Sequence, residues 1–339
     1  MRVVSIAAIL CLLASGAFAT GEVSLIDQSG FEYLINTDVT FSTSSSASGA
    51  VSDALFTTVV GGVTTVSGDT LSTFLSEAFD GYNGISVAVD GGGAAVYNDN
   101  GAATFGDGGR TVIYAAQPFG DIDVHRKVFV PTDDTFCRWL NVFTNTDNVT
   151  HTVVMQTANN LASDLDTTIH STSSGDATAD TTDKWVVTYE APALDFSTDP
   201  RLSHVLQGAG ASVGLSDISF ADGDENPTWE YTFEVAPGET VIIMTFVSGH
   251  PNLAAAEAKA ASLAALEGAA VDFMSSTEKG QVINFDVPLP QPPRPGCFAG
   301  SVGNMSALSS MQFSAGNILV VLLVTAVLVG ARRSLTQER

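Results

Sequence analysis

Basic residues are scarce in this chain. Thirteen lysines and arginines stand against 37 aspartates and glutamates, which gives a formal net charge of −24 over 339 residues. Proteins that bind nucleic acid through its phosphates carry a basic footprint. The charge therefore excludes nucleic acid as a partner and favours a well-solvated surface. A Ca²⁺-dependent adhesive surface is the second interpretation of the same charge.

Cysteine is nearly absent and forms no framework. The three cysteines, Cys11, Cys137 and Cys297, lie far apart in the sequence. Cys11 falls in an apolar N-terminal run, and Cys297 falls in the tail of the chain. This spacing excludes a disulfide-stapled scaffold. Cys137 lies in an apolar, strand-like run, so we expect it to be a buried free thiol.

Catalytic signatures are also missing. The sequence has no G-x-S-x-G elbow and no Walker loop, and its histidines show no HxH or HxxxH spacing. We therefore predict no catalytic residue and a chain that is not an enzyme, with every histidine structural or exposed. The histidines are His125, His151, His170, His204 and His250.

The N-terminus has the features of a secretory signal. One early arginine, Arg2, precedes an apolar run from Val3 to Leu13. Small residues, Ala17 and Ala19, then occupy the −3 and −1 positions of a signal-peptidase site. We predict cleavage after Ala19, which sends the rest of the chain out of the cytoplasm.

The C-terminus ends in an apolar segment followed by basic residues. Residues 311–331 are almost all apolar, and at about 1.5 Å per residue a helix of this length spans a bilayer core of roughly 30 Å. Arg332 and Arg333 follow directly and place the tail on the cytoplasmic side. We predict a single-pass membrane protein with its N-terminus outside. A lipid-anchor signal would end in the apolar run, whereas here RRSLTQER follows.

A proline-rich stretch and a short motif come before that segment. PLPQPPRP at 288–295 leads into Pro295-Gly296-Cys297. The order of motif, apolar helix and basic cluster resembles the C-terminal sorting signals of prokaryotic surface proteins, the PEP-CTERM and MYXO-CTERM classes. The resemblance covers about the last 45 residues and implies a cell-surface location and a sorting protease. Under it, Pro295-Gly296-Cys297 is the sorting or processing motif, and the apolar segment is either retained or removed.

The middle of the chain reads as a series of strands. Trp229, Tyr231, Phe233 and Val235 alternate with polar residues, and 241–247 is a nearly continuous apolar run beyond Pro237-Gly238. We predict that these two strands form a β-hairpin. Further strands are expected at 32–35, 85–89, 111–115, 124–130, 137–144, 152–157 and 184–189, and an apolar strand at 281–287.

Two helices are expected near the end of this region. Asn252 is a candidate N-cap, and Leu253, Ala256, Ala260 and Leu263 recur at helical spacing before Gly268. Ser275 and Glu278 have the spacing of a capping box for a second short helix. The predicted fold class is mainly β: an antiparallel β-sandwich, or a large supersandwich, with one or two C-terminal helices and then a single transmembrane helix.

Several blocks resemble a module of large bacterial secreted proteins. They are 126–131, 136–145, 160–166, 185–187 and 204–208. The resemblance spans about 120 residues and implies a two-sheet sandwich like those that accompany carbohydrate-active domains.

Acidic clusters supply the candidate cation and acid–base residues. Asp222, Asp224 and Asn226 place oxygen side chains two residues apart, which suits Ca²⁺, while a polar hairpin loop explains the same residues. Two further pairs, Asp121 with Asp123 and Asp164 with Asp166, share a strand face each, where acid–base or metal chemistry competes with simple solvation. We predict no cofactor apart from this candidate Ca²⁺.

The domain prediction follows from these segments. It places a signal peptide at 1–19, the β-sandwich ectodomain at 20–286, a linker with the sorting motif at 287–310, the transmembrane helix at 311–331 and a basic tail at 332–339. The predicted function is a non-catalytic surface protein for envelope structure, adhesion or matrix contact. A carbohydrate-binding or carbohydrate-processing module and a self-assembling coat subunit are the alternatives, with the membrane, a sorting protease and a glycan as partners.

Overall fold

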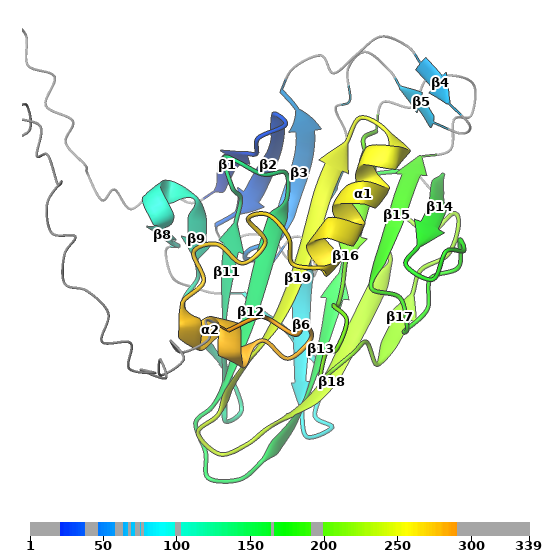
Figure 1. The fold of residues 1–339 in the computed structure, drawn as a ribbon. Helices are drawn as coiled ribbons and strands as arrows, with labels where there is room; N and C mark the ends of the chain where they lie inside the picture. Colours follow the sequence, from blue (N-terminus) through cyan, green and yellow to red (C-terminus); the bar gives the residue numbers. More distant parts are fainter. Residues whose placement is uncertain are drawn as a thin grey trace, which may run out of the picture. The chain divides into compact units, whose positions relative to one another are not determined.

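The computed structural model describes residues 21–37, 47–57, 64–66, 69–71, 75, 78–98, 103–163, 166–190 and 199–289. All of them belong to one compact unit, Met1–Pro290. This unit is mainly β, with antiparallel strand ladders and, within the described ranges, two short α-helices (Figure 1). The expectation of a mainly β, antiparallel fold with one or two C-terminal helices is confirmed.

The largest sheet has nine strands. Its order is β14 (Thr167–Thr172), β15 (Trp185–Glu190), β16 (Arg201–Val205), β19 (Thr240–His250), β12 (Cys137–Asn145), β11 (Ile122–Phe129), β9 (Thr111–Ile113) and β8 (Thr104–Gly106), with β10 (Gln117–Phe119) also paired to β11. A 3₁₀ turn, η2 (Asp107–Gly109), joins β8 to β9.

Three smaller sheets complete the strands. A five-stranded sheet has the order β17 (Asp217–Ser219), β18 (Thr228–Val235), β13 (His151–Ala158), β6 (Gly84–Val89) and β7 (Ala95–Val96). A three-stranded sheet contains β1 (Glu22–Ile26), β2 (Phe31–Asn36) and β3 (Val51–Phe56), and a pair is formed by β4 (Thr64–Val66) and β5 (Asp69–Leu71).

The nine-stranded sheet is buried on both faces. On β12, Cys137, Trp139 and Phe143 belong to the larger core cluster, which also contains Trp229 and Tyr231 of the five-stranded sheet. We call this side the core face. Because side chains alternate along a strand, Leu140 and Val142 point to the opposite side and join a second cluster with α1. We call that side the helix face. The prediction that Cys137 is a buried free thiol is confirmed.

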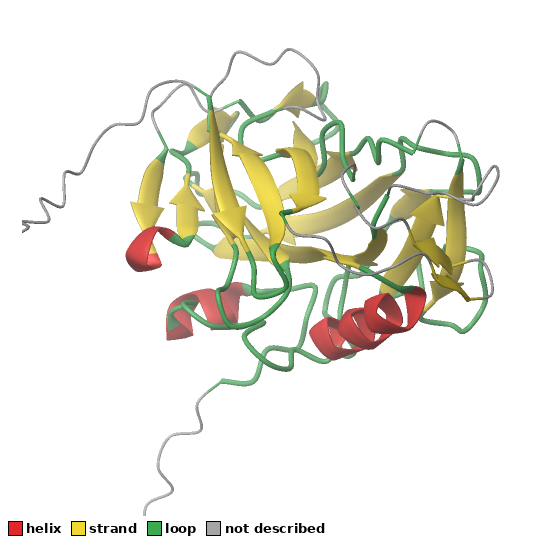
Figure 2. Cartoon of the chain, turned by 90° about the horizontal axis from the view of Figure 1, so that it is seen from above, coloured by secondary structure: helices red, strands yellow, loops and turns green. Residues whose placement is uncertain are grey.

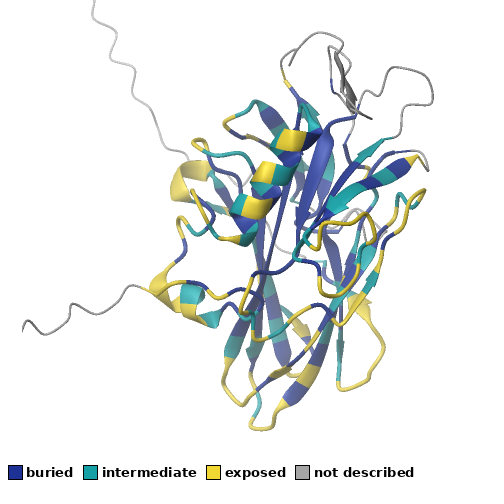
Figure 3. Ribbon diagram, turned by 45° about the vertical axis from the view of Figure 1, so that its right-hand side comes forward, coloured by how far each residue is buried: buried dark blue, intermediate teal, exposed yellow. Residues whose placement is uncertain are grey.

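The helix face is covered by the C-terminal part of the unit. The first helix, α1 (Leu253–Ala264), buries Leu253, Ala256, Ala260 and Leu263, and the Asn252 side chain accepts a hydrogen bond from Ala255 N at its start. The second, α2 (Ser276–Gln281), has the predicted capping box of Ser275 and Glu278. Figure 2 shows the helices along one side of the strands, and Figure 3 shows buried residues concentrated in the strands beneath α1.

The predicted hairpin of 229–235 and 241–247 is wrong. Both segments are strands, but β18 pairs with β13 and β17, whereas β19 pairs with β12 and β16. The turn at 236–239 therefore leads from one sheet to the other. The reason is burial: β18 has one buried face, which suits the five-stranded sheet, and β19 is apolar on both faces, which suits the centre of the larger sheet.

The predicted strand at 281–287 is also wrong. Gln281 closes α2, and the following residues make only one isolated bridge, Val282 with Ile242. β16 pairs only with Phe246–His250 of β19, and residues 282–284 lie along the edge that it leaves open, where Ile283 N donates to the Ile242 carbonyl at 3.1 Å but a side chain, that of Asn284, makes the next contacts in place of backbone. Phe285 and Val287 instead pack onto the helix face, where the Asn284 side chain hydrogen-bonds the Met244 backbone N and O at 2.9 and 2.7 Å.

The predicted signal peptide at 1–19 and the predicted transmembrane helix at 311–331 both lie outside the described residues. Among the residues that the structure describes, no helix has the length and apolar character to cross a membrane. The segment 311–331, for which a transmembrane helix is expected, is not among them.

Candidate functional site: a charged pocket on the helix face

A pocket of about 160 Å³ opens on the helix face of the nine-stranded sheet. Its floor consists of two rows of cross-strand neighbours from β9, β11 and β12. One row is Ile113, Lys127 and Leu140, and the next is Thr111, Phe129 and Arg138. The antiparallel register places these six side chains on one face.

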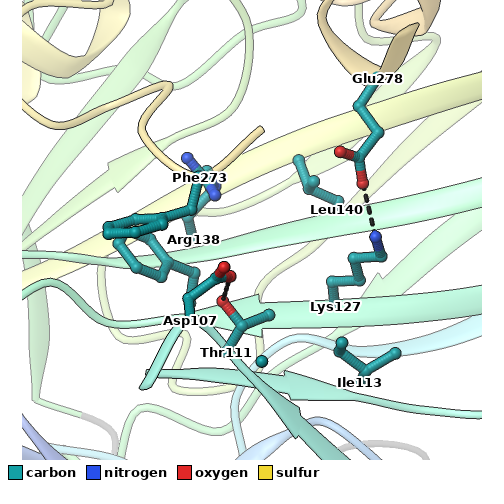
Figure 4. A pocket seen from close by; sticks show the side chains of 10 residues that line it. Asp107, Thr111, Ile113, Lys127, Arg138, Leu140, Phe273 and Glu278 are labelled. Carbon is teal, nitrogen blue, oxygen red and sulfur yellow. Dashed lines mark hydrogen bonds and ion pairs between the residues drawn. The ribbon is translucent and has the colours of Figure 1, made fainter. Parts of the chain in front are cut away.

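The rim of the pocket comes from two other parts of the chain. Gly106 ends β8 and Asp107 begins η2, whereas Phe273 precedes α2 and Glu278 lies within it. Figure 4 shows these side chains around the pocket, with Lys127 and Glu278 pointing toward one another. Asp107 is fixed by a hydrogen bond of 2.6 Å that the Thr111 hydroxyl donates to its Oδ2.

Arg138 is the most unusual of the lining residues. Its side chain is buried, with 2% exposed, and its guanidinium carbon lies 4.7 Å from the centre of the Phe129 ring. It donates one hydrogen bond, from Nη1 to the Ala270 carbonyl oxygen at 2.7 Å, while its buried Nε has no partner. Burial lowers the pKa of Arg138 to about 10, so the group still carries its positive charge at neutral pH.

No carboxylate of the described residues forms an ion pair with Arg138. Its pKa is raised from longer range by three carboxylates, those of Glu278, Asp272 and Asp107, and this opposes the effect of burial. A buried charge without a close counter-ion is costly, and an unmade hydrogen bond of a buried charged donor adds to that cost. Arg138 is therefore the lining group suited to an anionic ligand group, while Asp107 and Glu278 balance the overall charge of the lining.

Lys127 and Glu278 form an ion pair across the pocket. The Nζ to Oε1 distance is 2.6 Å, and both side chains are partly buried. The other carboxylate oxygen, Oε2, accepts hydrogen bonds from the Ser275 backbone N and hydroxyl at 2.8 Å each. Burial acts to raise the pKa of Glu278, but the bonds from Lys127 and Ser275 outweigh it and lower the pKa. Glu278 is thus an ionised acceptor held in a fixed position.

Phe273 places an aromatic ring at the rim. It is 63% exposed, and its ring centre lies 5.4 Å from that of Phe129. Its φ angle is +57°, in the left-handed region where a non-glycine residue is strained. The chain therefore holds a large apolar side chain in solvent on a strained backbone, at the same pocket that Arg138, Lys127 and Glu278 line.

In the predicted Ca²⁺ loop both aspartates accept backbone hydrogen bonds, one from β14 and one from within the loop. Asp222 Oδ1 accepts a hydrogen bond from Ile169 N at 2.8 Å, and Asp224 Oδ1 accepts one from Asn226 N at 2.9 Å. These are the contacts of the polar-loop interpretation, and Ca²⁺ binding at Asp222, Asp224 and Asn226 stays a prediction. Two pairs of aspartates were the other candidates. In the first pair, Asp121 is exposed and Asp123 is half-buried, and neither lines the pocket. Asp164 lies outside the described residues, and Asp166 is exposed.

The remaining predicted site residues fall outside the described part of the chain. They are the signal-cleavage residues Ala17 and Ala19, the motif Pro295, Gly296 and Cys297, and the topology residues Arg332 and Arg333.

The pocket itself was not predicted from the sequence. Its residues come from 106–113, 127–140 and 273–278, which no local motif connects. One signal was present: in a chain with only 13 basic residues, Lys127 and Arg138 both lie within segments that the sequence predicts to be strands. Charged residues at such positions are rarely buried without a partner.

Comparison with known proteins gives partial similarities of fold. No family model matches the sequence, and no curated protein matches it. Among solved structures, a polysaccharide lyase is 12% identical with a TM-score of 0.42, covering 72% of this chain and 34% of that one. Heparan sulfate lyase HepC from Pedobacter heparinus is 13% identical with a TM-score of 0.39, covering 70% and 36%. A putative kojibiose phosphorylase from human microbiome is 9% identical with a TM-score of 0.43, covering 74% and 33%.

This chain spans about a third of the length of each of these three structures. All three are named as enzymes that act on carbohydrates. The finding overturns the sequence-based prediction that the chain is not an enzyme, and we withdraw that prediction.

Proposed function

We propose that the protein is a carbohydrate-binding or carbohydrate-processing surface module, and that the pocket over β9, β11 and β12 is its site. The observation that carries the proposal is the buried guanidinium of Arg138, a residue that lines the pocket and whose Nε lacks a hydrogen-bond partner. Guanidinium groups bind carboxylate and sulfate-like anions through several N–H donors. The preferred ligand is therefore a sugar that carries an acidic group, such as a uronate or a sulfated residue.

The other lining groups support a sugar over a simple anion. A sugar ring has an apolar face and a rim of hydroxyls, and the exposed ring of Phe273 offers a surface for that face. The Glu278 carboxylate accepts hydrogen bonds from hydroxyls, and the Lys127 ammonium donates to them. The volume of about 160 Å³ is below the roughly 300–1,000 Å³ of pockets for drug-sized ligands, which suits one ring at the end of a chain.

The proposed architecture is a two-sheet β-sandwich. Trp139 of β12 and Trp229 of β18 lie in one core cluster, with the ring of Tyr82 5.8 Å from the first and 6.0 Å from the second. The ring centres of Phe143 and Phe233 lie 5.0 Å apart, which supports face-to-face packing of the nine- and five-stranded sheets. The outer side of the larger sheet then carries the helices and the pocket.

The proposed location is the cell surface. The signal ending at Ala19, the apolar segment 311–331 and Arg332-Arg333 support a single-pass protein with its N-terminus outside. Pro295-Gly296-Cys297 is the proposed processing motif. Mass spectrometry of the mature protein checks this: a C-terminus near Cys297 supports processing, and an intact Arg339 rules it out.

A binding experiment with the full-length chain tests the proposed site. The probes are matched oligosaccharides that contain uronate, sulfated or neutral sugars. We expect the acidic sugars to bind best, and Arg138→Met to weaken their binding by roughly 10- to 100-fold, the value of a hydrogen bond to a charged group. Lys184→Met is the matched control, because it removes one positive charge from a residue that does not line the pocket.

Two outcomes count against the proposal. Equal binding of acidic and neutral sugars would remove the role of Arg138, and equal effects of Arg138→Met and Lys184→Met would reduce the site to overall charge. Product analysis separates binding from processing. If the module processes its ligand, Glu278→Gln removes turnover, whereas a binding module shows no turnover with any of the probes.

A further inference from the structure

A second group of polar side chains gathers where two turns meet. One turn joins β10 to β11 and contains Asp121, and the other joins β12 to β13 and contains Asp147. His151 is the first residue of β13. One ligand atom from each of these three residues lies within 4.8 Å of the other two.

The imidazole of His151 is held in one orientation. Its Nδ1 lies 2.6 Å from Asp90 Oδ2, and the other oxygen of Asp90 accepts a hydrogen bond from Thr152 N at 2.9 Å. Asp90 follows directly after β6, so the ring is fixed from a neighbouring strand. A histidine whose Nδ1 proton is held by a carboxylate presents the lone pair of Nε2 on its other side, the arrangement that carboxylates impose on metal-binding histidines.

The Nε2 atom of His151 is buried and lacks a hydrogen-bond partner. The whole residue is only 6% exposed. Nε2 lies 3.5 Å from Asp147 Oδ2, which is long for a hydrogen bond of a charged pair. Two ligands that each lie about 2.1 Å from one tetrahedral ion are separated by about 3.4 Å. The spacing therefore fits two ligands of the same ion.

The turn that carries Asp147 is fixed before any ion arrives. The Asn145 side chain, which is buried, accepts from Asp147 N at 2.8 Å and donates to the Val149 and Val235 carbonyls at 2.6 and 2.9 Å. Thr146 joins this turn to the other one, because its backbone N and its hydroxyl both donate to the Asp121 carbonyl at 2.9 Å. Asp121 itself is exposed, so its side chain is free to swing onto an ion.

We propose that His151, Asp147 and Asp121 bind a divalent transition-metal ion, with Asp90 orienting the histidine. One imidazole and two carboxylates suit zinc, and their partial exposure leaves a further position for water. The bound ion would connect the β10–β11 turn to the β12–β13 turn. None of these residues lines the charged pocket, so the inference does not depend on the proposed sugar site.

The competing explanation is an ion-pair cluster without metal. The Asp90 carboxylate, and to a smaller extent that of Asp147, raises the pKa of His151, and a protonated ring would lie between the two. The two explanations differ in what a chelator and an added metal do to the protein.

Titration calorimetry of the chelator-treated, full-length protein with zinc chloride tests the proposal. The buffer contains about 0.15 M salt, which screens the general attraction of an acidic surface for cations. We expect one ion per chain. Asp147→Asn and Asp121→Asn should each weaken binding at least tenfold, and Asp90→Asn by about 10- to 100-fold through its hold on the ring. Asp123→Asn is the matched control, a carboxylate two residues from Asp121 and outside the group.

Thermal melting with and without zinc supplies the second measurement. Bound metal raises the melting temperature of the wild type and of Asp123→Asn, and this rise disappears in Asp147→Asn. No zinc binding to the wild type, or Asp121→Asn and Asp147→Asn proteins that bind zinc as tightly as the wild type does, overturns the proposal. A melting temperature that zinc leaves unchanged while Asp147→Asn lowers it identifies the ion-pair cluster instead. Manganese should bind more weakly than zinc at the same site.

Discussion

Two buried arginines on neighbouring strands have different surroundings. Arg126 of β11 lies on the core face, and Arg138 of β12 lies on the helix face. Arg126 donates from Nε to Asn141 Oδ1 at 2.8 Å, from Nη1 to the Ser48 carbonyl at 3.0 Å, and from Nη2 to both oxygens of Asn83 at 2.6 and 2.8 Å. Arg138 makes one such bond and keeps a buried Nε without a partner.

The difference between the two lies in their partners and not in their burial. Burial lowers the pKa of each to about 10, so both remain charged at neutral pH. Neutral oxygens from three parts of the chain surround Arg126, which makes it a structural cross-link of the core. Arg138 lines a pocket and keeps a buried Nε donor without a partner. Buried charge alone therefore does not indicate a site, whereas buried charge with an unused donor does.

The largest expected effect on stability is that of Arg126→Met, and Arg138→Met is the variant to compare with it. Arg126→Met leaves the Ser48 and Asn83 carbonyls and the Asn141 side chain without their donor, so we expect a loss of about 3–5 kcal/mol or failure to fold. Arg138→Met orphans one carbonyl and removes an unpaired charge, so we expect a change of about 1 kcal/mol or less. Urea unfolding measures the free energy of unfolding of both variants, and an unchanged slope m shows that the difference is one of stability. Equal losses of stability in the two variants would show that the two arginines do not differ in their structural role.

The second-largest expected effect is a loss of stability in acid, and it arises on the core face. His204 is fully buried between the Tyr82 hydroxyl at 2.8 Å and the Thr188 hydroxyl at 3.0 Å, and burial lowers its pKa to about 3. The unfolded chain takes up this proton near pH 6.5 and the folded chain does not, so stability falls as the pH drops from about 6.5 toward 3. The slope is up to about 1.4 kcal/mol per pH unit.

The His204→Phe variant isolates that effect. His250 is also buried with a pKa lowered to about 3, so it contributes a second proton to the wild type. We expect the difference in unfolding free energy between wild type and variant to change with pH by one proton's worth across this window. A difference that stays constant from pH 6.5 to 4 would mean that the folded protein protonates His204 and that the core face is not sealed.

Local signals in the sequence were sufficient for most elements, with the strand expected at 281–287 as an exception, but not for their pairing. The alternation at 229–235 correctly predicted β18, and the Ser275–Glu278 spacing correctly predicted the capping box of α2. The sheet to which each strand belongs depends on contacts across the core, and for this reason the hairpin of 229–235 and 241–247 was wrong. The alternation of apolar and polar residues along a single strand does not show which strands pair with it.

The candidate site was out of reach for a related reason. Nearly every residue of β12 is buried, so alternation does not show which face of the strand Arg138 occupies or what lies opposite. Phe273 comes from a segment more than 130 residues away, and no spacing rule links it to β12. His151 was expected to be structural or exposed because it has no nearby histidine; its partners Asp90 and Asp121 come from other strands and turns.

The smallest expected effect on stability is at Phe273, and it separates structure from ligand binding. Its backbone is left-handed, at a cost of about 1 kcal/mol for a side chain other than glycine. Phe273→Gly removes that strain and also the contact with Phe129, so we expect a net change within about 1 kcal/mol. Phe273→Ala loses the ring but keeps the strain, so it should be less stable than the glycine variant.

Val149 gives the matched control, because it is exposed and lacks a positive φ angle. There the order should reverse, with Val149→Ala more stable than Val149→Gly by about 0.4–1 kcal/mol, since glycine adds freedom to the unfolded chain. Both Phe273 variants should bind the acidic oligosaccharide more weakly, and both Val149 variants should bind it as the wild type does. A glycine variant at Phe273 that keeps both its stability and its binding would show that the strained, exposed ring serves neither the fold nor the ligand.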